Sequence, residues 1–174
     1  MLNRSVTALT TIAGLAFIST IPAAHGLDRA PPNGGGVVPQ AVGDPPKVLY
    51  RTAGVRDDGG GTGLGTATSF QCSNLSAVNE TMVIHIRDQF GTVRVNKAFP
   101  LEASRTKTIS THFTDVFIED ASLNAGIISQ GLATISASTT NIICSVMVVN
   151  AAGFPPEGIA LHLVRFNPIA GSQE

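Results

Sequence analysis

The chain has 174 residues, with 11 basic and 12 acidic side chains and a formal net charge of −1. No run of lysine or arginine is visible along it, which argues against nucleic acid as a partner. Only 13% of the residues are charged and 43% are hydrophobic, so the chain has enough apolar side chains to bury a core. Its length suits one domain with short extensions.

The first 26 residues have the pattern of a secretory signal peptide. Arg4 gives a basic start, residues 9–21 are apolar and uncharged, and small residues precede a cleavage site that we expect between Ala24 and Asp28. The apolar stretch is shorter than the roughly 20 residues that span a bilayer, and we expect no transmembrane segment in the mature chain. We therefore expect an exported protein, periplasmic or extracellular.

Residues 27–46 are predicted to form a flexible arm. The stretch from residue 28 to residue 46 contains five prolines and four glycines, a composition that opposes regular secondary structure. The predicted domain therefore begins at Lys47 and occupies residues 47–174.

Short segments with alternating apolar and polar residues follow along the domain, separated by glycine, proline and asparagine. Alternation with a period of two is the pattern of half-buried β-strands. The segments are 47–53, 66–73, 80–87, 92–98, 106–111, 127–137, 142–150 and 158–166. We expect a bulge at Gly131, because an isolated glycine inside a strand often marks one.

Segments 80–87 and 92–98 are predicted to form a hairpin around a turn that ends in Gly91. One face of the first strand carries its strongest apolar side chains, Met82, Ile84 and Ile86. The opposite face carries Val83, His85 and Arg87. In the second strand Val93 and Val95 are expected to point inward, and Arg94 outward.

Residues 54–65 are rich in glycine but match neither dinucleotide-binding nor phosphate-loop spacing. They precede a strand rather than a helix, so we expect a long flexible hairpin loop. Asp57 and Asp58 resemble a fragment of a calcium loop, without its alternating ligands or closing glutamate.

Residues 112–124 fit either a short helix or a loop. If they were helical, Asp115 and Glu119 would be neighbours on one face and, with His112, could ligate a metal. A solvated acidic loop is the alternative that we favour, because no other histidine or cysteine clusters there. We therefore expect no metal and no other cofactor.

Cys72 and Cys144 are the only cysteines, and in an exported chain they predict one disulfide. A two-cysteine metal site would need a second close pair of ligands, which the sequence does not offer. We expect the bridge to join two buried strands across a sandwich. The chain-entropy argument gives such a bridge roughly 4 kcal/mol.

The fold class predicted from these segments is all-β, a two-sheet antiparallel sandwich of about 7–9 strands with one disulfide. Over residues 47–166 the strand spacing, with Cys72 on an early strand and Cys144 on the penultimate one, resembles the immunoglobulin-like sandwich. The chain departs from that pattern because it has no tryptophan, and Ile142 stands where a tyrosine would precede the second cysteine.

The sequence offers no catalytic motif. The nearest approach to a nucleophile elbow surrounds Ser129, but it lacks the first glycine and sits inside a predicted strand. We therefore expect a non-catalytic module with a binding or structural role at the cell surface or in the periplasm, and a protein or surface component as its partner. The alternatives are a subunit of an extracellular fibre or adhesin assembled by strand addition, and a weak metal- or carbohydrate-binding module.

Outward-facing positions are mostly small and polar, with few aromatic or arginine anchors for an interface. Backbone pairing at a sheet edge needs no such anchors. We therefore expect a partner to contact an edge strand at residues 47–53 or the glycine loop at residues 54–65.

Overall fold

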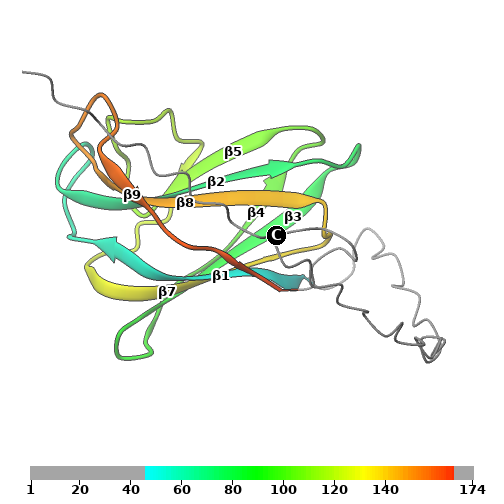
Figure 1. The fold of residues 1–174 in the computed structure, drawn as a ribbon, viewed down its shortest axis with the longest axis horizontal. Helices are drawn as coiled ribbons and strands as arrows, with labels where there is room; N and C mark the ends of the chain where they lie inside the picture. The colour runs from blue at the N-terminus through cyan, green and yellow to red at the C-terminus, as the bar shows by residue number, and fades with distance from the viewer. Residues whose placement is uncertain (1–45, 167–174) are drawn as a thin grey trace, which may run out of the picture. The chain divides into compact units, whose positions relative to one another are not determined.

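A computed structural model describes residues 46–166, which form ten strands in two five-stranded sheets (Figure 1). The predicted signal peptide, residues 27–45 of the predicted arm, and residues 167–174 lie outside the described residues. The two sheets pack face to face and enclose the core between them. The predicted fold class, an all-β two-sheet sandwich with one disulfide, is confirmed.

The sheet that we call sheet A has the strand order β10-β1-β7-β3-β4. Its strands are β1 (Lys47–Asp57), β3 (Glu80–Asp88), β4 (Val93–Leu101), β7 (Ile128–Ala137) and β10 (Val164–Arg165). All its neighbouring strands are antiparallel.

The second sheet, sheet B, has the order β6-β5-β2-β8-β9. Its strands are β2 (Thr66–Asn74), β5 (Thr106–Ser110), β6 (Ala121–Ser122), β8 (Ile142–Asn150) and β9 (Gly158–Ala160). β5 and β6 run parallel, and the other pairs are antiparallel.

The alternating pattern locates the core correctly in the central strands. Met82, Ile84 and Ile86 of β3 are completely buried, as predicted, and they meet Phe70 of β2 in one continuous cluster. Each such side chain contributes about 1.5–3 kcal/mol by leaving water. The sandwich is therefore held together chiefly by the inner faces of the two sheets.

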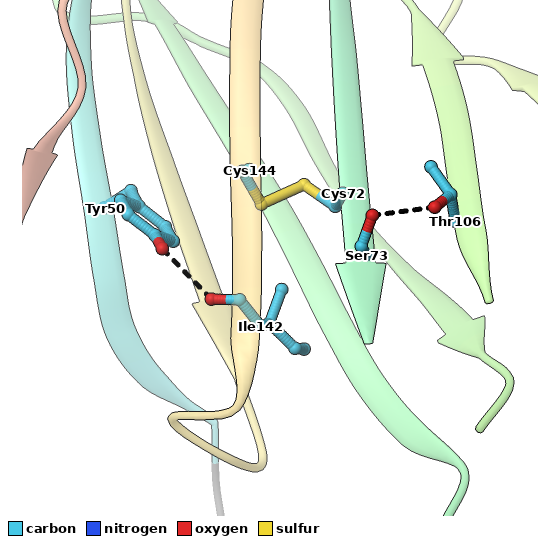
Figure 2. Close-up of a disulfide and its surroundings, with 6 residues drawn as sticks. All are labelled: Tyr50, Cys72, Ser73, Thr106, Ile142 and Cys144. Carbon is cyan, nitrogen blue, oxygen red and sulfur yellow. Dashed lines mark hydrogen bonds between the residues drawn. A yellow bond between two sulfur atoms is a disulfide. The ribbon is translucent and has the colours of Figure 1, made fainter. Parts of the chain in front are cut away.

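The disulfide joins Cys72 to Cys144, as predicted, but it lies within sheet B and does not connect the two sheets (Figure 2). The two cysteines are direct register partners on the adjacent strands β2 and β8, with their Cα atoms 4.2 Å apart. The alternation shows that Cys72 lies on the same face of its strand as Phe70, but it does not show which strand lies beside β2. The expectation of a bridge across the sandwich was therefore wrong.

The glycine-rich segment between β1 and β2 is not a hairpin loop, because β1 belongs to sheet A and β2 to sheet B. β1 also continues four residues past the predicted end at Ala53. It does so through a bulge at Gly54, whose φ is 89°. The register is irregular beside Gly131, as predicted, but the extra residue there is Gly54 of β1 and not a residue of β7. A second irregularity follows at once, because Arg56 of β1 lies opposite two residues of β7, 129–130.

The hairpin of β3 and β4 is confirmed. Asp88 stabilises its turn by accepting hydrogen bonds from the backbone N–H groups of Phe90 and Thr92 through Oδ1. Val95 is buried as expected, but Val93 is 47% exposed. A register shift at Arg94 turns the start of β4 away from the core, which the simple alternation did not anticipate.

The predicted strand 158–166 divides into β9 in sheet B and β10 in sheet A. In Figure 1 this segment, coloured orange to red, passes from β8 to the side of β1. Leu161 and Leu163, between the two short strands, pack against the core cluster. The segment therefore closes one side of the sandwich. Its division, together with the short strand β6 in residues 112–124, explains why ten strands replace the predicted 7–9.

Residues 112–124 contain no helix, so the helical alternative was wrong and the loop alternative is correct. The segment includes β6, and Thr114 and Glu119 hold it internally. The Thr114 hydroxyl donates a short hydrogen bond to Oε1 of Glu119, and the Thr114 backbone N–H donates to the same oxygen at 3.1 Å.

Candidate functional site

The outer faces of the two sheets differ in what covers them. Outside sheet B, Ala67, Val149 and Ala151 are buried in a second small apolar cluster, against which Phe117 packs. The loop that follows β5 is anchored there, because the backbone N–H of Asp115 donates to the carbonyl of Ala151 at 2.8 Å. This face is thus partly sealed by the protein's own chain.

The outer face of sheet A carries a row of polar side chains that runs straight across four strands. The register places Arg51 of β1 opposite Thr134 of β7, Thr134 opposite His85 of β3, and His85 opposite Asn96 of β4. Neighbouring strands are about 4.8 Å apart, so consecutive side chains of this row lie within contact distance. We call these four residues the polar row.

A shallow depression of about 610 Å³ lies over the polar row. Its other lining residues are Pro46, Val48, Val83, Arg87, Leu132 and Ser136. Thr134, Ser136, Val83 and His85 are half-buried and form the floor, whereas Arg51 and Arg87 are exposed. We call this depression the sheet A groove.

The two arginines of the groove are each held by one contact that leaves other donors available. The guanidinium of Arg51 lies 4.7 Å from the centre of the Phe166 ring, a cation–π contact. Nη1 of Arg87 donates to the carbonyl of Gly91 at 2.9 Å. A guanidinium has five N–H donors, so both side chains retain capacity for a ligand.

His85 contributes an unsatisfied group beneath the groove. Its Nε2 atom is buried and has no hydrogen-bond partner among residues 46–166. A buried polar atom without a partner costs about 1–3 kcal/mol.

A second depression, of about 860 Å³, adjoins the groove at Leu132. It is lined by residues of β1, β7 and the end of β3, among them Arg56, Gln130 and Asp88. The bulge at Gly54 lies in its wall and bends β1 at this point. Together the two depressions extend along much of the outer face of sheet A.

His112 is buried beside Asp57 rather than exposed in an acidic loop. Its Nδ1 lies 2.9 Å from Oδ2 of Asp57, and its Nε2 lies 3.0 Å from the carbonyl oxygen of Leu64. Both ring nitrogens therefore lie within hydrogen-bond distance of an oxygen, and the ring is held from two sides. The pair fastens the glycine-rich segment to the end of β5.

The low-priority metal candidate, His112 with Asp115 and Glu119, is not assembled. Glu119 accepts hydrogen bonds from Thr114 and from the hydroxyl of Ser110, whereas the exposed Asp115 carboxylate lies against Gly63. Among residues 46–166 no three histidine, cysteine or acidic side chains are placed to hold a metal ion.

Asp58 also serves the glycine-rich segment rather than a cation. Slight burial acts to raise the pKa of its carboxyl group, but hydrogen bonds from the backbone N–H groups of Thr66 and Gly60, together with nearby His112, outweigh it and lower the pKa. Oδ2 of Asp58 accepts from Thr66 at 2.8 Å. The aspartate therefore organises the turn into β2.

β1 is not an edge strand, so the premise of the expected partner contact at residues 47–53 was wrong, whereas the contact itself stays a prediction. β1 pairs along its length with β7, and Tyr50 and Arg51 also pair with β10. Further along, Arg56 exchanges two hydrogen bonds with the hydroxyl of Thr68, at 2.9 and 2.8 Å. The long edge of sheet A is β4 instead.

No family model, no curated protein and no solved structure matches this chain. Across residues 46–166 the chain also forms no helix of a length and hydropathy that could span a bilayer.

Sequence reasoning did not select the polar row. It placed His85 and Arg87 on one outward face and left the partners of that face undefined. The alternation of β3 and β7 contains this information in part, because it separates Thr134 and Ser136 from the buried Ala133 and Ile135. The alternation does not give the register between strands, which is what aligns the four residues of the polar row.

Proposed function

We propose that this protein is an exported, non-catalytic β-sandwich module that binds a surface or periplasmic partner through the sheet A groove. The observation that carries the proposal is the groove itself, an open depression lined by aligned polar and cationic side chains. Pockets of several hundred Å³ with a few convergent polar groups are typical ligand sites.

The chemistry around the potentially reactive groups supports a binding role. His112 and Asp57 are committed to each other, and Glu119 to its own loop. Glu80, 7% exposed, accepts hydrogen bonds from the hydroxyls of Ser138 and Ser76. These bonds organise the fold, so each group already has a structural task.

Export is supported by the disulfide and by the signal pattern of residues 1–26. Disulfides persist in oxidising compartments and are rare in reducing ones. Cys72 is completely buried, and Cys144 packs against the same core. N-terminal sequencing of the secreted protein should find a first residue after Ala24.

The test fills the groove and asks whether binding to cell-surface material is lost. Ser136→Trp places a large ring on the half-buried floor of the groove in β7. Ser145→Trp places the same ring at an exposed position of β8, in the other sheet. Tryptophan is well tolerated in strands, so both variants should fold.

The mature protein is immobilised and incubated with solubilised envelope material from the producing cell. We expect retention by the wild type and by Ser145→Trp, and loss in Ser136→Trp. Equal retention by both variants, with both shown to fold by circular dichroism, would remove the groove from the proposed function.

Assembly into a fibre by strand addition is the second candidate, and the edge of β4 is the observation that bears on it. In residues 46–166 β4 pairs only with β3. Its edge, however, carries a bulge at Arg94, the cation Lys97 and Pro100, all devices that discourage pairing with another chain. Lys97 also donates to the carbonyl of Leu123 at 2.7 Å. We therefore favour the groove.

A further inference from the structure

We propose that the ligand of the sheet A groove is an anionic polysaccharide whose carboxylate or sulfate groups pair with Arg51 and Arg87. This inference rests on the proposed function and names the ligand class for the same groove. The residues that line the groove include both arginines and His85 but no aspartate or glutamate. The groove is therefore complementary to negative charge.

The two arginines are placed to contact one extended ligand. Arg51 is the register partner of Thr134, and Arg87 is that of Leu132, so they lie two strands and two residues apart. Sheet geometry puts their Cα atoms about 12 Å from each other. Separate acidic groups along one polymer can therefore engage both guanidiniums.

The tethers of the arginines reduce the entropic cost of binding. Arg51 lies over Phe166, and Arg87 is hydrogen-bonded to Gly91. Each side chain is thus partly ordered before a ligand arrives, which lowers the rotamer entropy lost on binding. Guanidinium groups pair with carboxylates and sulfates through two parallel hydrogen bonds, which suits both kinds of acidic polysaccharide.

The polar lining of the groove favours sugar over peptide. Thr134, Ser136 and Asn96 offer hydroxyl and amide groups that match the hydroxyls of a sugar ring, and His85 has a nitrogen without a partner in residues 46–166.

An extended peptide lacks what it would need here. The central strands β1, β7 and β3 have neighbours on both sides, so a peptide cannot add to them through its backbone. The apolar lining residues are Val48, Val83, Leu132 and Pro46, which form no deep pocket for an aromatic anchor. Charge and hydroxyl contacts therefore have to provide the affinity.

The experiment measures binding of the mature, disulfide-bonded protein to three polymers at low ionic strength. Polygalacturonate carries carboxylates, dextran sulfate carries sulfate esters, and unmodified dextran is neutral. The test variant is Arg51→Gln with Arg87→Gln. The control variant, Arg105→Gln with Lys107→Gln, removes the same charge from the turn after β4 and from β5 of the other sheet.

We expect wild type and control to bind at least one anionic polymer with affinities within about threefold of each other, and neither to bind dextran. The groove variant should bind at least about tenfold more weakly, because two charge-assisted hydrogen-bonding groups are lost. Added salt should weaken the wild-type interaction, since the arginines are exposed. The preferred polymer identifies the acidic group.

Two results would overturn the inference. One is equal weakening in both double variants, which would mean that only net charge matters. The other is no binding to either anionic polymer. If Ser136→Trp still abolished envelope binding in that second case, the groove would remain the binding site and only the ligand class would be wrong. Anionic binding that persisted in Ser136→Trp would instead count against the groove itself.

Discussion

The buried pair of His112 and Asp57 gives the sharpest test of how the glycine-rich segment is held. Oδ2 of Asp57 meets Nδ1 of His112 at 2.9 Å, and Oδ1 accepts the backbone N–H of Gly59 at 2.7 Å. The side chains retain only 11% exposure for His112 and 1% for Asp57. Removing one partner of such a pair strands the other away from water.

The size of the effect should depend on which partner is removed. His112→Ala leaves the buried Asp57 carboxylate without its ring partner, which costs about 3 kcal/mol. Asp57→Asn keeps an oxygen for Gly59 and can donate from its amide to a neutral His112, so we expect about 1 kcal/mol. The double variant has no stranded charge, and it should be about 2 kcal/mol more stable than the sum of the two single changes implies.

The assay is urea unfolding of the disulfide-bonded protein, followed by tyrosine fluorescence and circular dichroism. The chain has one tyrosine and no tryptophan, and Tyr50 is 6% exposed with its hydroxyl donating to the carbonyl of Ile142 (Figure 2). The single tyrosine therefore reports on the packed sandwich. Additive single effects within about 0.5 kcal/mol, or a His112→Ala cost below about 1 kcal/mol, would refute the buried-pair reasoning.

Two further predictions concern the backbone and the disulfide. Replacing Cys72 and Cys144 by alanine should lower the free energy of unfolding by about 4 kcal/mol, because the bridge closes a separation of 72 residues, and thiol labelling of the folded wild type without reductant should find none. Gly54→Ala should cost about 1–2 kcal/mol in the same urea assay, because φ is 89° there and the new Cβ would lie 3.2 Å from Leu161. Gly61→Ala, where a Cβ meets nothing within 4 Å, is the matched control and should change stability little.

The strands themselves were predictable because one face of each central strand is buried. The alternation in residues 66–73 and 80–87 predicted β2 and β3 to within one residue. It was less reliable where the backbone departs from a regular ladder. The bulge at Gly54 allowed β1 to continue through a residue that was interpreted as the start of a loop, and the shift at Arg94 exposed Val93.

Pairing between strands that are distant in the sequence was not predictable, and the disulfide shows why. The hydrophobic pattern gives the face of each residue, and Cys72 and Cys144 were correctly placed on inner faces. The same pattern is satisfied whether the two strands face each other across the core or lie side by side. Only the packing of the whole chain, which makes β2 and β8 neighbours, decides between these arrangements.

The candidate site was hidden for the same reason. Arg51, Thr134 and His85 are separated widely in the sequence, and each looks like an ordinary outward-facing residue of its strand. Register alone aligns them. His112 shows the converse case, in which a histidine in an acidic segment suggested a ligand although the fold buries it against Asp57 at the end of β1.

The path of the chain between β5 and β7 determines which sheet can present a binding face. Residues 111–120 fold back over sheet B, where Phe117 packs on the cluster of Ala67 and Val149. Residues 122–125 then run close to the side chains of β4, where their carbonyls accept hydrogen bonds from Lys97 and Arg94. One connection thus covers part of the outside of sheet B and lies against the β4 side of sheet A, while the outer face of sheet A keeps the open depression over its polar row. A ligand that needs several aligned side chains can find them on that face.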